Sequence, residues 1–386
     1  MSEQIGSSYR PPGERPLATG PRTGLCLCGG GITGAMYEVG CLAALEDIFD
    51  GFYACDFDAF VGTGAGSTVA VALAGGLRAA RLYRALLDPA DDFFPLRRQH
   101  LLGVDYQEWR RVASTVLSAS KRALASVVAS PLDTDVWHEL ERFIDSLPAG
   151  LFALDAYERF LAEFMERRSI PRSFAAMPKP LAVVAYDLDA GERRVFGASR
   201  QPRSTDGALG PFLDVPVESA VAASSAIPIL YAPVRIDDRD YVDGGLGDEA
   251  HVDVAVAMGC EAVLVLNPMV PIRSEVHLRD IPTGHGRMKR VRDKGLTWVY
   301  NQSFRMRSES RLLDGLARFR SSHPDLNVLL LEPDPSDATL FMHSPMNFAA
   351  RRAILTHAYT TTYQAMRSPD SSLRKLIEQR GFQAKE

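Results

Sequence analysis

The sequence predicts an α/β fold built on a mainly parallel sheet. Residues 24–49 and again residues 59–74 each combine a short apolar strand, a glycine-rich turn and a helix. Residues 328–331 form a continuous apolar run of the kind shown by a strand buried on both faces. Strands that alternate with helices in this way are typical of α/β proteins.

The first of these units contains a glycine loop that allows two interpretations. A strand at residues 24–28 leads into the loop Gly29–Gly34, and an amphipathic helix is expected at 35–49. Unpaired backbone N–H groups meet at such a helix start. The loop matches G-x-G-x-x-G, and Asp56 and Asp58 follow about twenty residues on, as in a dinucleotide site. Alternatively, its amides form an oxyanion hole that stabilises developing negative charge.

The second unit contains a sharp turn with three alternating glycines. The strand at 59–61 runs through Gly62-Thr63-Gly64-Ala65-Gly66 into a small-residue helix, which is the geometry of a nucleophile elbow. The outer glycines remove side chains that would clash in so tight a turn. In the pattern G-x-S-x-G the middle residue is a serine, whereas here it is Gly64, which has no side chain. The scaffold for covalent catalysis is therefore present without its nucleophile, and the elbow favours the oxyanion interpretation of the preceding loop.

Residues 78–175 are mostly helical by their pattern. Helices are expected at 81–87, 106–126, 133–147 and 156–168. We expect this helical insertion either to cover the site as a lid, which would suit a lipid substrate, or to pack on the sheet as ordinary helices.

The chain then returns to strands and reaches an acidic turn. A hairpin is expected at 180–196, a small-residue helix at 217–224 and a strand at 231–236. Asp243-Gly244-Gly245 follows the next strand, so an acidic side chain lies in a loop that other backbone segments can approach closely. Asp243 is thus a candidate catalytic carboxylate, although an ordinary Asp-Gly turn is the commoner explanation of such a pattern.

The remaining third of the chain completes the sheet and adds a basic segment. A helix at 252–258, a strand at 262–266 and closing helices near 345–366 and 371–380 are expected. Between the last two strands, residues 287–320 hold about ten basic residues against three acidic ones, with apolar and aromatic residues interleaved. This segment is interpreted either as a basic amphipathic helix in peripheral contact with an anionic membrane or as a surface helix with a solvated basic face.

The composition is that of a soluble globular protein. Of 386 residues, 46% are hydrophobic and 24% charged, and the formal charge of −5 gives no general attraction to nucleic acid. The five cysteines form no disulfide framework, and the C-x-C of Cys26 and Cys28 lacks a second pair, so we expect no metal, no cofactor and a cytoplasmic setting. No apolar run of about 18 residues occurs, and residues 1–22 predict a disordered tail rather than a signal peptide.

Four signatures in order resemble the patatin-like phospholipase family from about Gly24 to Pro268. They are the glycine loop, the elbow, the run A-A-S-S-A-I-P at 222–228 and Asp243-Gly244-Gly245. The resemblance implies a three-layer α/β/α fold in which a serine–aspartate dyad hydrolyses acyl esters of lipids. It implies that Asp243 is the general base, that the amides of Gly30 and Gly31 are oxyanion donors, and that the motif glycines are Gly29, Gly34, Gly62, Gly66, Gly244 and Gly245.

Two positions depart from the family pattern. Gly64 occupies the nucleophile position, and Thr33 stands where the family often carries Arg or Lys before the last loop glycine. Without an oxygen or sulfur at position 64, Asp243 has no hydroxyl to activate, and no acyl-enzyme forms by the usual route. We therefore expect that the protein comes from a lipid acyl hydrolase lineage and is itself inactive or strongly impaired as a hydrolase. The alternatives are a natural pseudoenzyme that binds lipid or a protein partner, and a Rossmann-type nucleotide-binding protein.

The expected organisation has three parts. A tail at 1–22 precedes a patatin-like α/β domain at 23–270, into which the helical insertion at about 78–175 is placed. A C-terminal extension at 271–386 adds a further strand and helices that pack on the same domain.

Overall fold

The structure of the protein is a computed structural model that describes residues 21–104, 109–110, 114, 147–198, 210–247, 250–273, 281–283, 286–288, 290–334, 339, 343, 346–379 and 382–385. Nearly all of the tail expected at 1–22 lies outside these ranges. So do most residues of the helices expected at 106–126 and 133–147.

A mixed, mainly parallel sheet forms the centre of the molecule. Its strands are β1 (Thr23–Leu27), β2 (Ala59–Thr63), β4 (Leu181–Asp187), β5 (Glu192–Gly197), β7 (Val234–Ile236), β8 (Arg239–Asp243), β9 (Ala262–Leu266) and β12 (Asn327–Leu331). They lie in the order β12-β9-β1-β2-β4-β8-β7, with β5 also paired to β4. Neighbours from β12 to β4 are parallel, and β5, β7 and β8 pair in antiparallel fashion.

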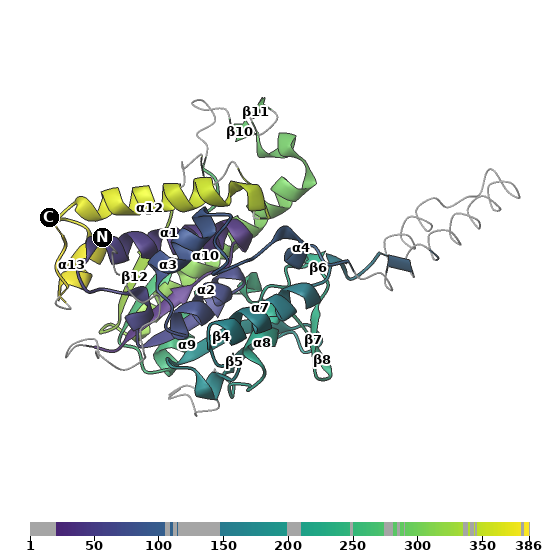
Figure 1. Ribbon diagram of the computed structural model, residues 1–386, viewed down its shortest axis with the longest axis horizontal. Coiled ribbons are helices and arrows are strands. Elements are labelled where there is room, and N and C mark those ends of the chain that lie inside the picture. The colour runs from purple at the N-terminus through teal and green to yellow at the C-terminus, as the bar shows by residue number, and fades with distance from the viewer. Residues whose placement is uncertain are drawn as a thin grey trace, which may run out of the picture.

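Helices cover both faces of this sheet (Figure 1). Successive strand residues point to opposite faces, so Leu25 and Leu27 enter one hydrophobic core while Cys26 and Cys28 enter the other. The first core is closed by α1 (Gly31–Ile48), α2 (Ala65–Ala74), α3 (Ala79–Leu87), α7 (Asp155–Arg167), α8 (Val217–Ser224) and α12 (Arg351–Arg367), and the second by α9 (Val252–Ala257) and α10 (Leu296–Ser322). The predicted α/β fold with a mainly parallel sheet between helices is therefore confirmed.

Smaller elements complete the described part of the chain. They are α4 (Arg98–Leu101), α13 (Ser372–Gln379), a parallel pair of β3 (Gly150–Phe152) with β6 (Ile229–Tyr231), an antiparallel pair of β10 (Ile281–Thr283) with β11 (Gly286–Met288), and 3₁₀ turns at Ala54–Asp56, Phe174–Ala176, Gly244–Leu246, Val291–Lys294 and Phe348–Ala350.

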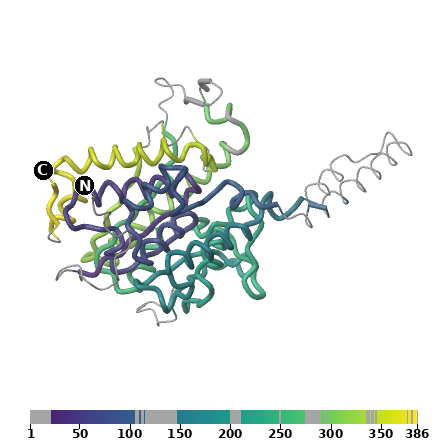
Figure 2. Tube along the Cα trace, in the orientation of Figure 1, coloured from purple at the N-terminus to yellow at the C-terminus, as the bar shows by residue number. Residues whose placement is uncertain are grey.

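Helix α12 runs beside α1, although the two are far apart in the sequence (Figures 1 and 2). A Cβ added at Gly40 of α1 would lie 2.7 Å from the carbonyl oxygen of Leu355, so the two helix backbones meet closely at this glycine. The hydroxyl of Tyr359 donates to Asp47 at 2.8 Å. Together with β12, which pairs with β9, these contacts join the last third of the chain to the central sheet and its helices.

Most expected boundaries lie within two residues of the observed ones, and three elements differ by more or in kind. The helix expected from residue 35 begins at Gly31, because the N–H of Gly34 donates to the carbonyl of Gly30 and closes a first helical turn inside the glycine loop. The strand expected at 231–236 is two strands in two different sheets, because Pro233 has no N–H to continue a strand ladder. The helix expected from about residue 345 begins at Arg351. Of the helices in the described ranges, none combines the length and apolarity needed to cross a membrane.

Candidate active site

Gly64 forms the tip of a turn between β2 and α2, with φ 54° and ψ −131°. Its N–H donates to the Ser224 hydroxyl at 2.9 Å, and that hydroxyl donates to the carbonyl of Val184 at 2.5 Å. Its carbonyl accepts from the hydroxyl of Ser225 at 3.2 Å and from the N–H of Ser67 at 3.1 Å. The elbow is thus held by α8 on one side and by the first turn of α2 on the other.

The two outer elbow glycines are required by close packing. A Cβ on Gly62 would lie 2.4 Å from the Cα of Ser67, and one on Gly66 would lie 2.4 Å from the carbonyl oxygen of Cys28. Both distances are far inside van der Waals contact. The turn therefore brings strand and helix together only with glycine at these positions.

Asp243 is the last residue of β8 and lies opposite the elbow. Its N–H donates to the carbonyl of Ala226 at 3.0 Å, and one carboxylate oxygen, Oδ1, accepts from the N–H of Gly245 at 2.7 Å. A Cβ on Gly64 would lie 3.5 Å from Oδ2 and 3.7 Å from Oδ1. The structure therefore brings the carboxylate against the elbow residue, as the sequence-based hypothesis of a hydrolase site requires.

Burial controls the protonation of this carboxylate. The Asp243 side chain is almost completely buried, and desolvation raises its pKa to about 7, against the opposing effect of the Gly245 N–H. A carboxylate with a pKa near neutrality is suited to accept and return a proton at physiological pH.

The glycines that follow Asp243 are fixed by backbone contacts. A Cβ on Gly244 would lie 2.1 Å from the carbonyl oxygen of Val184, so only glycine fits against β4. The carbonyl of Gly244 accepts from Nε2 of His251 at 3.1 Å, and Arg193 donates to the other ring nitrogen at 3.2 Å. The buried His251, which immediately precedes α9, therefore supports the Asp-Gly-Gly turn.

The glycine loop reaches the same point from the other side. The Cα of Gly29 lies 3.2 Å from the Cβ position of Gly64. Gly30 and Gly31 both have positive φ, at 121° and 63°, and Gly31 is the first residue of α1 and lines the cavity described next. Since α2 begins at Ala65, which lines the same cavity, the positive ends of two helices converge beside Asp243.

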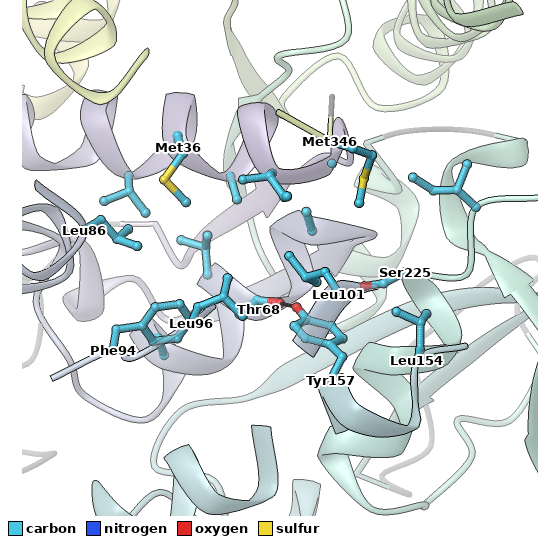
Figure 3. A pocket seen from close by; sticks show the side chains of 18 of the residues that line it. Met36, Thr68, Leu86, Phe94, Leu96, Leu101, Leu154, Tyr157, Ser225 and Met346 are labelled. Carbon is cyan, nitrogen blue, oxygen red and sulfur yellow. Dashed lines mark hydrogen bonds between the residues drawn. The ribbon is translucent and has the colours of Figure 1, made fainter. Parts of the chain in front are cut away.

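A mostly apolar cavity leads to this point (Figure 3). It holds about 760 Å³ of empty space including its open mouth, of which about 70 Å³ admits the centre of a water molecule, so it is narrow. Its polar residues include Thr68 and Tyr157, whose hydroxyls point toward one another and form a hydrogen bond. Most of the remaining walls come from the glycine loop, α1, α2 and the insertion, and include Met36, Leu86, Phe94, Leu96, Leu101 and Leu154.

Two further side chains that carry a reactive oxygen or sulfur lie close in sequence to the elbow or to the glycine loop, Ser67 and Cys28. The hydroxyl of Ser67 is buried and donates to the Gly64 carbonyl, and Cys28 is buried in the second core, so neither faces the cavity. Sequence reasoning missed the link between Ser224 and Gly64 and the cavity position of Tyr157. The motif at 222–228 marks Ser224 but does not indicate its partner, and α7 carries no local mark that distinguishes Tyr157 from a core aromatic.

Comparison with known proteins is consistent with this geometry. The family model described as patatin-like phospholipase matches residues 25–256. The chain is 24% identical over 113 residues to the probable lipid hydrolase 463L of Invertebrate iridescent virus 6, a match that spans 28% of this chain and 35% of the viral protein.

Two solved structures are similar at low identity. VipD from Legionella pneumophila has 16% identity and a TM-score of 0.35, with 90% of this chain and 67% of VipD covered. The complex of SpcU with ExoU from the type III secretion system of Pseudomonas aeruginosa gives 16% identity and a TM-score of 0.31, with 94% of this chain and 59% of that chain covered.

Proposed function

Because this chain belongs to the patatin-like phospholipase family, we propose that it comes from a lipid acyl hydrolase lineage and that Gly64 stands at the position of the nucleophilic serine. The observation that carries the proposal is the 3.5 Å between Oδ2 of Asp243 and the Cβ position of Gly64. A serine hydroxyl carried on that Cβ would lie within hydrogen-bond reach of the carboxylate. Asp243 is then the general base, and the amides of Gly30 and Gly31 are the oxyanion donors.

The missing hydroxyl removes the covalent route. Loss of a nucleophile typically lowers turnover by about 10⁶-fold, because no acyl-enzyme forms. We propose that the protein is inactive or strongly impaired as a serine-type hydrolase, while the pocket that receives the acyl group is retained.

The cavity supports an acyl chain as the bound group. Its walls are predominantly aliphatic and aromatic, and its narrowness fits an extended chain better than a bulky ring. Burial of each methylene in such a site contributes about 0.8 kcal/mol. A pseudoenzyme that binds lipid is therefore the second candidate function, and it uses the same cavity.

The nucleotide-binding alternative receives no comparable support. Asp58, one of the acidic residues expected to contact a ribose, accepts instead from the N–H and the hydroxyl of Thr23, at 2.8 and 3.0 Å. The glycine loop is in contact with the elbow residue Gly64. This contact supports the oxyanion interpretation of the loop.

Peripheral membrane contact through residues 287–320 is part of the proposal, as is a cytoplasmic location. Helix α10 exposes Leu296, Val299 and Met306, and four exposed arginines follow on the same helix, Arg307, Arg311, Arg318 and Arg320. Tyr300 of the same helix lies near the site, since after burial the charge of Asp243 is the next largest cause of its raised pKa.

We expect the protein to sediment with vesicles that contain phosphatidylserine. A Leu296→Ser, Val299→Ser double variant should sediment less. Equal sedimentation of both proteins would refute this contact.

The test of the proposed function is the Gly64→Ser variant, assayed on short-chain esters and on phospholipids beside the unaltered protein. We expect the variant to gain at least about 10²-fold in turnover, up to the 10⁶-fold that a nucleophile is typically worth. The gain should disappear in the Gly64→Ser, Asp243→Asn double variant.

The result separates the two candidates. A gain that needs Asp243 supports the hydrolase lineage with its nucleophile lost. A folded Gly64→Ser variant without any gain would remove the hydrolase assignment, and tight binding of a fluorescent fatty acid by that variant would then favour the lipid-binding pseudoenzyme.

A further inference from the structure

We infer that the protein retains a slow esterase activity of its own, in which Asp243 activates a water molecule that attacks the acyl carbonyl directly in place of a serine. This inference rests on the proposed function, because it uses the same carboxylate and the oxyanion donors of the glycine loop. It differs in assigning an activity to the protein with Gly64 in place.

The carboxylate is placed for this task. One oxygen, Oδ1, is engaged by the N–H of Gly245 at 2.7 Å. The other, Oδ2, lies 3.5 Å from the point where a Cβ would leave Gly64. Because glycine carries no side chain, the volume that a serine CH₂OH would fill next to Oδ2 is open to a water molecule.

The cavity has room and polar groups for that water. The part that admits the centre of a water molecule is about 70 Å³, whereas a single buried water needs only about 10–15 Å³ of such volume and two to four polar partners. Asp243 and Ser225 both line the cavity, and the starts of α1 and α2 lie there at Gly31 and Ala65.

The same two helix starts stabilise the charge that develops on the ester. The first N–H groups of a helix have no partner within the helix and carry the positive end of its dipole. With α1 and α2 both beginning at the cavity wall, a carbonyl oxygen that becomes an oxyanion meets donors that are already oriented.

The reaction balances without any group outside the protein, the ester and water. The water oxygen forms a bond to the acyl carbon while Asp243 takes one of its protons. The tetrahedral intermediate then breaks the bond to the alkoxy oxygen, and the proton on Asp243 passes to that oxygen. The products are a carboxylic acid and an alcohol, with Asp243 again ionised.

This mechanism predicts a small rate with a defined pH dependence. In a hydrolase without its nucleophile, the oxyanion hole and binding retain about 10³–10⁴-fold over the reaction in water. Because the base must be ionised, the rate should rise through about pH 7, the value to which burial raises the pKa of Asp243. The rise should be roughly tenfold between one pH unit below and one pH unit above that value.

The experiment uses the full chain and p-nitrophenyl butyrate as the probe. The unaltered protein is compared with Asp243→Asn at several pH values, and each is treated with a fluorophosphonate that labels activated serines. Gly64→Ser serves as the positive control, since it should show a burst of product and covalent labelling. We expect the unaltered protein to turn over slowly with no burst and no label, and Asp243→Asn to fall to the buffer rate.

Several results would overturn the inference. These are an equal rate for the unaltered protein and a folded Asp243→Asn variant, a covalent label on the unaltered protein, or a protein-dependent rate that does not change around pH 7. The last measurement needs no variant and stands even if Asp243→Asn fails to fold. A gain in Gly64→Ser with no activity in the unaltered protein would leave the proposed function intact and refute this inference alone.

Discussion

Replacement of Gly64 by alanine tests whether the elbow backbone is strained for a residue that carries a side chain. The backbone of Gly64, at φ 54° and ψ −131°, lies in a region that side-chain-bearing residues enter at a cost of about 1–3 kcal/mol. The new Cβ would also meet the Cα of Gly29 at 3.2 Å. Alanine restricts the unfolded chain and thereby recovers about 0.4–1 kcal/mol, so we expect a net loss of about 1–2 kcal/mol in the free energy of unfolding.

Urea denaturation at constant pH gives this difference, and Gly191→Ala is its matched control. Gly191 also has positive φ, 66°, but a Cβ there would have no atom within 4 Å, so its replacement reports backbone strain without contact. We expect Gly191→Ala to lower the free energy of unfolding by less than Gly64→Ala does. A Gly64→Ala protein as stable as the unaltered one would refute the claim that the elbow is strained.

Three further outcomes follow from the same geometry. Ser224→Ala should lower the unfolding free energy by about 1–3 kcal/mol, measured in urea, because it leaves the buried N–H of Gly64 without its partner. Burial raises the pKa of Asp243 and of Glu46 to about 7, from ordinary values of 3.8 and 4.5. At pH values between the ordinary and the raised pKa of these two groups, the native state therefore binds more protons than the unfolded state. The free energy of unfolding should fall as pH rises from about 4 to 7, and Asp243→Asn should make this fall smaller. Ala72→Phe should fill the cavity and weaken binding of a fluorescent fatty acid, measured by titration, while circular dichroism stays unchanged.

The local units of the site could be predicted because each depends on neighbours in sequence. The elbow requires glycine at positions 62 and 66, where any Cβ would come within 2.4 Å of another atom. The same holds for Gly244 after Asp243, where a Cβ would meet backbone of β4. Such steric demands leave a pattern in the sequence itself, and strand and helix periodicity supplied the order of the elements around them.

Contacts between distant segments left no such pattern. The bond from Gly64 to Ser224 spans 160 residues, and the one from Thr68 to Tyr157 spans 89. Nothing near Tyr157 indicates that its hydroxyl faces a cavity, since a helix with aromatic residues on one face predicts burial and no particular neighbour. The break between β6 and β7 was missed for a related reason, because the effect of Pro233 depends on which strands its neighbours join.

The amino-acid sequence alone determined the α/β architecture, the glycine loop, the elbow and the absence of a hydroxyl at residue 64, since these follow from backbone sterics and periodicity within short segments. Only the tertiary structure decided that Asp243 lies 3.5 Å from the Cβ position of Gly64, that the starts of α1 and α2 meet there, and that a narrow apolar cavity ends beside them. Those features depend on the strand order of the sheet, which places β8 two strands from β2 and so brings the carboxylate to the elbow.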